Sequence, residues 1–393
     1  MMPFIPRKKD YQVTPFSNRV AVSIFFFISG FNFAAWAARI PALQRQLKLS
    51  DAQLGTVLAA LPTGLMITMP LAGFVLNKFS SRHVMLVSSI VYTCLLCLLG
   101  VATNVTEAVI ILFLFGASRN FFNISVNTQS IGVQALYSKS IVTTFHGIWS
   151  LAALTGAALS FLFTRLSVTI VNHFLIVAIS SIVLIIIVFR FTLKTDKRSI
   201  TKTKGFVMPD RPLIKLGMIG FASMVCEGTM SDWSGIYLSK VVGVHDNLIT
   251  IGYIAYLSAM VSGRFAGDFL VNMVGVKKLL QMSGASIGIG FLLAISFPTL
   301  ISATFGFAMI GFGVSCIMPL VFSITPKISS LGTGSAIAAI STVSYLGFLA
   351  GPPIVGYIAQ AANLKWAFSV CILLSLLVNF LVIKLRIDKP DSV

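Results

Sequence analysis

Acidic side chains are scarce in this sequence. Its 393 residues contain 11 Asp and Glu against 29 Lys and Arg, and only 10% of all residues are charged. Hydrophobic residues make up 56% and the mean hydropathy is +0.94. Because a water-soluble globular surface cannot be built from so few charges, the composition excludes a soluble protein and predicts an integral membrane protein.

Motifs for nucleotide-driven or catalytic chemistry are missing as well. The chain contains no G-x-x-x-x-G-K-[ST] stretch, the signature of a phosphate-binding loop. Its four histidines are scattered, and no nucleophile, base and orienting group fall at one membrane depth. Cys94 and Cys97 have the spacing of a redox or metal pair but lack partner ligands, so we interpret them as packing residues. We expect no metal, no cofactor and no enzymatic activity.

Long apolar stretches fill most of the chain. A membrane-crossing helix needs about 20 apolar residues, and it satisfies its backbone hydrogen bonds internally. The sequence therefore predicts an all-α integral membrane protein with twelve transmembrane helices. The expected spans are residues 20–39, 53–76, 84–104, 108–131, 141–165, 168–190, 213–239, 248–271, 278–297, 299–324, 334–359 and 366–386.

Basic residues are distributed unevenly between the two sides of the membrane. If the N-terminus lies in the cytoplasm, most Lys and Arg residues fall in cytoplasmic segments, as the positive-inside rule requires. The formal charge of +18 therefore indicates orientation and contact with anionic lipids, and not binding to nucleic acid. We expect a multi-pass protein of the cell inner (plasma) membrane with both termini in the cytoplasm and a retained first helix.

One long polar segment, rich in Lys and Thr, divides the spans into six and six. Adding 195 to a residue number carries the loop at 77–83 onto the loop at 272–278, between the second and third span of each half. This repeat indicates two pseudo-symmetric six-helix halves. We place an N-terminal half at 1–190, a basic cytoplasmic linker at 191–212 and a C-terminal half at 213–393.

These motifs resemble those of the major facilitator superfamily, whose members have two parallel six-helix halves. The stretch GFVLNKFSSRH at 73–83 is similar to the cytoplasmic loop motif of that family, although Asn77 and Ser80 replace the usual aspartate and glycine. Five further stretches resemble a bacterial branch related to fucose permease that includes rhizopine-transport-type members: FNFAAWAARIPALQRQL, NISVNTQSIGVQ, TFHGIWSLAALTGA, EGTMSDWSGIYL and SYLGFLAGPPIVGYIA. Asn123 and Gln134 differ from the acids common in that branch. The resemblance implies secondary active transport by alternating access.

Residues at the ends of the spans are candidates for gating between the two halves. They are Arg39 at the outer end of the first span, and Asn77, Lys78, Arg82, Asn272 and Lys277 in the two equivalent loops.

Polar groups in mid-membrane are few. A charge there costs about 2.5–3.5 kcal/mol and so needs a partner or an aqueous cavity. They lie mainly in the first, fourth and seventh spans; the tenth, which should complete the set, offers mostly aromatic side chains. Candidate substrate-binding residues are Asn32, Trp36, Arg119, Asn120, Asn123, Asn127, Trp149, Glu227 and Trp233.

Two alternatives remain open for these side chains. Asn120, Asn123 and Asn127 share one helix face, and such a stripe either lines a cavity or holds helices together. Trp36 and Trp233 are equally suited to an aromatic belt at the membrane surface.

The stretch EGTMSDW holds two of the few acids. Glu227 and Asp232 point about 140° apart on a helix, so they belong to different sites. Glu227 is expected to face Arg119 across the cavity and to carry the coupling proton, because burial opposes its charge and an arginine favours it. Asp232 is expected to pair with Arg39 and is a second proton-coupling candidate; static ion pairs between the halves are the alternative for both acids.

His146 is a further candidate proton carrier, unless it only hydrogen-bonds a neighbouring helix. Amides bind hydroxyl groups and indoles cover sugar rings. We therefore expect a monomeric, proton-coupled transporter of a sugar, polyol or sugar derivative, whose partners are this solute, protons and membrane lipids. The alternatives are proton-coupled efflux of amphipathic compounds, which an aromatic tenth span would suit, and transport of a small organic anion bound by Arg119.

Overall fold

The computed structural model describes residues 14–138, 141–194, 211–328 and 333–385, and these residues form helices and no strands. Twelve of the helices are long and apolar enough to cross a membrane, which confirms the predicted fold class. The first six are α1 (Pro15–Ala37), α3 (Asp51–Lys78), α4 (Ser81–Val101), α5 (Val105–Gln134), α6 (Val142–Arg165) and α7 (Ile170–Phe189). The second six are α8 (Arg211–Tyr237), α9 (Ile251–Val274), α10 (Val276–Ser296), α11 (Leu300–Ile328), α12 (Thr333–Ala361) and α13 (Leu364–Ile383).

Three short helices were not anticipated from hydropathy: α2 (Ile40–Gln46), the π-helical turn η1 (Leu238–Val242) and the 3-10 turn η2 (Asp246–Leu248). They lie in the connections after α1 and α8. Most of the expected linker, residues 195–210, lies outside the described residues.

Polar side chains at the helix starts explain several boundaries. Thr14 accepts a hydrogen bond from the backbone N–H of Ser17 at the start of α1. Ser50 and Gln53 form a capping box at the start of α3. These side chains satisfy backbone donors that a helix N-terminus leaves unpaired.

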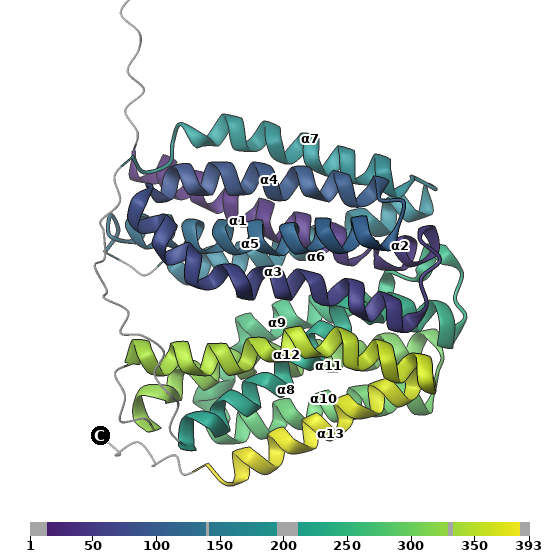
Figure 1. Ribbon diagram of the computed structural model, residues 1–393. Coiled ribbons are helices and arrows are strands. Elements are labelled where there is room, and N and C mark those ends of the chain that lie inside the picture. Colours follow the sequence, from purple (N-terminus) through teal and green to yellow (C-terminus); the bar gives the residue numbers. More distant parts are fainter. Residues whose placement is uncertain (1–13, 139–140, 195–210, 329–332, 386–393) are drawn as a thin grey trace, which may run out of the picture.

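The two halves repeat the same packing. In the N-terminal half α1 packs on α6, and α3 and α4 pack on α5; in the C-terminal half α8 packs on α12, and α9 and α10 pack on α11. The helices form two layers, one for each half (Figure 1). Equivalent glycines allow helices to approach closely: a Cβ at Gly116 would meet the carbonyl oxygen of Leu61, and one at Gly311 would meet that of Tyr256. Each pair is related by 195 residues, as the sequence repeat requires.

The halves meet along two equivalent helix pairs, α3 with α12 and α6 with α9. Here we name the end of the bundle where α1 and α8 begin, at the left in Figure 1, the terminal end. The two ion pairs found among the described residues both join the halves at the opposite end. Lys240 Nζ lies 2.5 Å from Asp51 Oδ1, and Arg45 Nη1 lies 2.6 Å from Asp246 Oδ1.

At the terminal end, equivalent basic residues bind helix ends within their own half. Arg82 Nη2 donates to the carbonyl oxygen of Phe189, at the end of α7, over 3.2 Å. Lys277 Nζ donates to the carbonyl oxygens of Ile383, the last residue of α13, and of Leu385 just beyond it, at 3.0 Å each. A cation at a helix C-terminus donates hydrogen bonds to free carbonyl oxygens and interacts favourably with the helix dipole.

Candidate substrate cavity

Two adjoining cavities lie between the halves. The larger has a volume of about 540 Å³ and the smaller about 180 Å³. The larger is lined by Phe26, Leu65, Met69, Arg119, Asn120, Asn123, Ile124, Asn127, Thr128, Ile131, His146, Trp149 and Tyr345. The smaller is lined by Leu61, Pro62, Leu65, Met66, Arg119, Asn123, Met224, Glu227, Tyr345 and Phe348. Arg119, Asn123 and Tyr345 line both, so the two volumes adjoin at these side chains and we consider them together.

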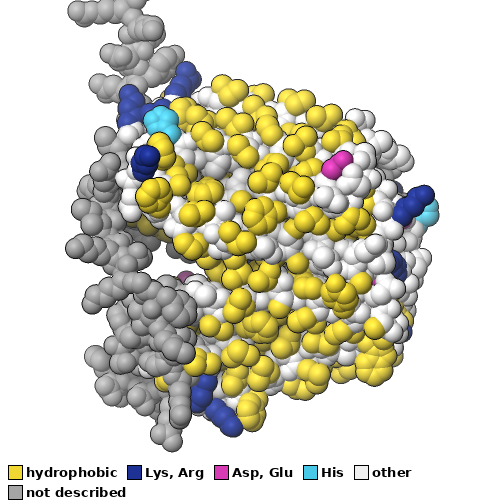
Figure 2. All heavy atoms as spheres, in the orientation of Figure 1, with side chains coloured by type: hydrophobic (Ala, Val, Ile, Leu, Met, Phe, Trp, Pro, Cys, Tyr) yellow, Lys and Arg dark blue, Asp and Glu magenta, His cyan; other side chains and the backbone are white. Residues whose placement is uncertain are grey.

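The larger cavity extends from Arg119 along α5 toward the terminal end, where Ile131 is 66% exposed. Figure 2 shows a hollow between the halves at this end. At the opposite end the halves are held together by the two ion pairs and by the packing of α3 on α12. In this conformation the site is therefore open toward the terminal end.

Arg119 lies at the junction of the two cavities. Its guanidinium carbon is 4.0 Å from the ring centroid of Phe33. The ring centroids of Phe33 and Trp149 are 6.3 Å apart. The Nε of Arg119 is buried without a hydrogen-bond partner in the described part of the chain. The guanidinium is therefore oriented by cation–π stacking and leaves donors for a ligand.

Glu227 faces the smaller cavity together with Arg119. The expected direct ion pair between them is absent: over the described ranges, the ion pairs within 4.0 Å are the two at the opposite end. Glu227 lies within electrostatic reach of two arginines, Arg264 and Arg119. Because both side chains line the smaller cavity, a solute bound there would contact both of them.

The asparagine stripe on α5 serves both of the roles weighed from the sequence. Asn120 is 4% exposed and donates to Thr68 Oγ1 on α3 over 3.1 Å, so it holds helices together at the cavity wall. Asn123 Oδ1 accepts a hydrogen bond from Ser29 Oγ at 3.2 Å. Asn127 Nδ2 donates to the carbonyl oxygen of Asn123 at 2.7 Å. All three line the larger cavity.

Three predicted cavity residues are buried in helix packing instead. Asn32 is 0% exposed; it donates to Thr93 Oγ1 and accepts from Ser181 Oγ, at 2.9 Å each. Trp36 and Trp233 are 1% and 0% exposed. The predictions that these side chains line the cavity are wrong, and neither tryptophan faces the membrane surface, because each points into a helix interface.

The expected pair between Asp232 and Arg39 is also wrong. Arg39 Nε donates to His173 Nδ1 over 3.0 Å, and its Nη2 donates to the carbonyl oxygen of Val168 over 3.1 Å. Arg39 therefore binds α7 of its own half. Asp232 is half-buried and lines neither of the two cavities.

Of the remaining predicted residues, His146 and Trp149 line the larger cavity from α6. Arg82 and Lys277 bind within their own halves, whereas Asn77, Lys78 and Asn272 are exposed at the terminal end. Their role in gating stays a prediction. No residue of α11 lines either cavity, because within the described residues α12 supplies that wall through Tyr345 and Phe348.

Two residues were not assigned a role from the sequence. Tyr345 lines both cavities, and Arg264 Nη1 donates to Ser150 Oγ over 2.7 Å, which joins α9 to α6 between the halves. The offset of 195 relates Tyr345 to Ser150, which is the neighbour of Trp149. This relation could have indicated from the sequence that Tyr345 lies at the cavity. Over the described residues, no group of three His, Cys, Asp or Glu side chains is placed to hold a metal ion.

Comparisons with known proteins agree with this architecture. The model of the Major Facilitator Superfamily matches residues 22–333 and 265–393. An uncharacterised MFS-type transporter of Yersinia pestis is 30% identical over 368 residues, covering 92% of this chain and 94% of that protein. The membrane protein MosC of Rhizobium meliloti is 29% identical over 348 residues, with 88% and 84% covered.

Solved structures share the fold at low sequence identity. The nucleoside transporter NupG superimposes with a TM-score of 0.72 at 14% identity, covering 93% of this chain and 98% of that one. A D-xylose-proton symporter superimposes with a TM-score of 0.73 at 13% identity, covering 92% and 97%.

A twelve-span membrane transporter without enzymatic function is the class of protein that this fold and cavity define. The chain belongs to the major facilitator superfamily, and the family resemblance drawn from its motifs is confirmed.

Proposed function

We propose that this protein is a proton-coupled secondary transporter of a small hydroxylated solute: a sugar, a polyol or a sugar derivative. The two halves would alternate access to the cavity around Arg119. The fold is shared with a D-xylose-proton symporter and a nucleoside transporter. Those similarities support the fold alone, so the argument for the solute depends on the residues of the cavity.

The observation that carries the proposal is the composition of the cavity wall. Asn123 and Asn127 offer amide groups, Tyr345 offers a hydroxyl group and Trp149 offers an indole ring, all facing one volume of about 540 Å³. This volume lies within the range of about 300–1,000 Å³ that is typical of small-molecule sites. Amides and hydroxyls bind sugar hydroxyls, and an aromatic face covers a sugar ring.

Glu227 is the proposed proton carrier. It is the one carboxylate among the residues that line the two cavities, and it makes no ion pair in the described structure. A carboxylate in such a place can gain a proton from one side and lose it to the other as the surrounding charge and solvation change. His146, on the wall of the larger cavity, is the second candidate carrier.

The proposal is tested first by binding and then by transport. A thermal-shift screen of the purified protein against sugars, polyols and organic acids at two pH values identifies the solute. Uptake of that solute into proteoliposomes then compares Asn123→Ala with Asn172→Ala, an exposed asparagine at the start of α7. Loss of hydrogen bonds to the solute should raise the KM of Asn123→Ala by about five- to 100-fold, whereas Asn172→Ala should match the wild type. An unchanged KM for Asn123→Ala would reject the site.

A small organic anion is the second candidate solute. Arg119 favours it, because the guanidinium has no carboxylate partner within 4.0 Å in the described residues and its Nε lacks an acceptor. In the same screen, stabilisation by organic acids alone would select this alternative. Efflux of amphipathic compounds loses its main support, since the aromatic α11 lines neither cavity.

The proposed location is the cell inner (plasma) membrane with the terminal end in the cytoplasm. Basic residues concentrated near the terminal end favour this orientation. Uptake into right-side-out and everted vesicles determines the direction of net transport.

A further inference from the structure

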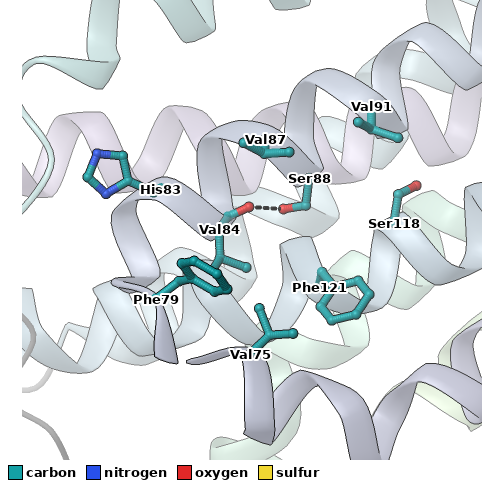
Figure 3. A pocket seen from close by; sticks show the side chains of 9 residues that line it. All are labelled: Val75, Phe79, His83, Val84, Val87, Ser88, Val91, Ser118 and Phe121. Atoms are coloured by element: carbon teal, nitrogen blue, oxygen red, sulfur yellow. Dashed lines mark hydrogen bonds between the residues drawn. The ribbon is translucent and has the colours of Figure 1, made fainter. Parts of the chain in front are cut away.

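A separate cavity of about 430 Å³ lies on the outer face of the N-terminal half, away from the transport site. It is a groove between the end of α3, the first turns of α4 and the middle of α5 (Figure 3). Its apolar walls are Val75, Phe79, Val84, Val87, Val91 and Phe121. Val87 is 60% and Phe79 54% exposed, and these helices span the membrane, so the groove opens to lipid.

Two serines in the groove do not make it polar. Ser88 Oγ donates to the carbonyl oxygen of Val84 over 2.6 Å, and Ser118 Oγ donates to that of Phe115 over 3.0 Å. Figure 3 shows the first of these bonds running along α4. Because each hydroxyl hydrogen is used by its own helix, the two serines offer no free donor, and this part of the groove suits a hydrocarbon chain.

The equivalent helices of the C-terminal half pack closely at the level of Gly313. Gly313 stands 195 residues after Ser118, and a Cβ there would meet the carbonyl oxygen of Ser283 at 2.7 Å, with Ile287 equally close. At this level α10 and α11 therefore lie backbone against backbone. In the N-terminal half the corresponding position is Ser118, which lines the groove together with Phe121.

The mouth of the groove is basic. His83 lines it, and Lys78 Nζ lies 5.7 Å from the ring centroid of Phe79. Both basic side chains are exposed, and the sequence contains no acid between Asp51 and Glu107. Lys, Arg and His side chains gather at this end of the N-terminal half, next to an apolar outer face (Figure 2).

We propose that this groove binds one acyl chain of an anionic phospholipid, with the phosphate of the headgroup held by Lys78 and His83. The span from His83 to Val91 corresponds to about 12 Å of helix rise, enough to hold roughly the first ten methylene groups of a chain. Chain binding depends on shape, since the alternative environment is other lipid, and headgroup binding depends on charge.

The test uses native mass spectrometry of the full-length protein in detergent with equal amounts of dioleoyl-phosphatidylglycerol and dioleoyl-phosphatidylcholine. Wild-type protein should retain one phosphatidylglycerol, with a preference of about fivefold or more for it. Val87→Trp, which fills the groove, should lose this molecule. Met282→Trp, the equivalent lipid-facing position at 46% exposure, should retain it. Equal retention by both tryptophan variants, or no preference in the wild type, would overturn the proposal.

Two further measurements separate the headgroup from the chain and remove any dependence on variant folding. Lys78→Gln combined with His83→Gln should bind both lipids equally; a retained preference would overturn the headgroup assignment. In wild-type protein, a phosphatidylglycerol with a diazirine in its acyl chain should label residues of 75–91 and 118–121. Labelling spread evenly over α4 and α10 would show annular lipid only and reject the groove.

Discussion

Arg119 is the side chain on which the chemistry of the cavity most depends. It stacks on Phe33, borders both cavities, and its Nε has no hydrogen-bond partner among the described residues. Glu227 lines the smaller cavity with it, and no ion pair within 4.0 Å joins the two in the described structure. A solute can therefore bind between an arginine of one half and a carboxylate of the other, and its arrival changes the charge that each group experiences.

Replacement of Glu227 tests proton coupling. With a pH gradient of one unit, symport of one proton can accumulate a solute about tenfold. Glu227→Gln keeps the shape of the side chain but cannot release a proton, so accumulation should fall to about onefold while exchange of labelled for unlabelled solute persists. Both are measured in proteoliposomes. Gradient-driven accumulation by this variant at the wild-type level would reject Glu227 as the carrier.

Arg39 has a structural role in place of the expected gating pair. Burial, and secondarily the charge of Arg45, lower the pKa of Arg39 to about 10, so it stays charged at neutral pH. Because its Nε–H donates to His173 Nδ1, the neutral imidazole carries its proton on Nε2, which faces Ser160 Oγ at 3.5 Å.

Arg39→Ala should therefore destabilise the protein. It leaves the carbonyl oxygen of Val168 and the ring of the buried His173 without their donor, which should lower the free energy of unfolding by about 1–3 kcal/mol. Arg165→Ala, an exposed arginine at the end of α6, should have little effect. Thermal unfolding in detergent measures both, and equal melting temperatures would contradict this role for Arg39.

At the scale of helices, close packing depends on small residues at equivalent positions. Gly116 lies against the carbonyl oxygen of Leu61, and Gly311 lies against that of Tyr256. Lipid tails are as apolar as the helix surfaces, so contacts of this kind and van der Waals packing, more than the hydrophobic effect, hold the spans together.

Gly116→Ala should be costly, because the added methyl group would collide with backbone that cannot move without separating α3 from α5. We expect a loss of about 1–3 kcal/mol in stability, measured as a lower melting temperature and reduced monodispersity. Gly73→Ala is the matched control in α3, since a Cβ there meets nothing within 4 Å. It should be neutral or slightly stabilising. Equal behaviour of the two variants would contradict the packing argument.

At the scale of the whole molecule, the halves are closed at one end and separated at the other. Lys240 and Arg45 pair with Asp51 and Asp246 across the closed end, and Gln44 also donates to Asp51 over 2.8 Å. Exposed ion pairs contribute only about 0.2–1 kcal/mol each. They can therefore bias the equilibrium between open and closed forms without locking it.

Asp51→Asn combined with Asp246→Asn should shift that equilibrium. Spin labels at Lys48→Cys and His245→Cys, two exposed positions at the closed end, would report it in a background without the native cysteines. Loss of both ion pairs should raise the fraction of molecules with a long distance between the two spin labels by about two- to 30-fold. Glu107→Gln is the control, because within the described ranges the carboxylate of Glu107 accepts hydrogen bonds from its neighbours Thr103 and Asn104 alone. Unchanged distances in the double variant would show that the pairs do not control closure.

Hydropathy and the internal repeat were sufficient to predict the positions of the membrane spans. The boundaries expected for α6 and α11, at 141–165 and 299–324, lie close to Val142–Arg165 and Leu300–Ile328. Asn32 and Asn123 show where this reasoning stops. Both are amides near the middle of a span, but one faces a three-helix interface and the other faces the cavity. The rotation of each helix separates them, and rotation is set by its neighbours.

The sequence by itself therefore determined the membrane, the twelve helices and the two equivalent halves, because length, hydropathy and repetition are local properties. Only the tertiary structure decided which polar side chains face the cavity, which partner Arg39 binds and which end of the bundle is closed. Those outcomes depend on contacts between segments far apart in the chain, such as Asp51 with Lys240, whose free energies are small and whose geometry no local pattern encodes.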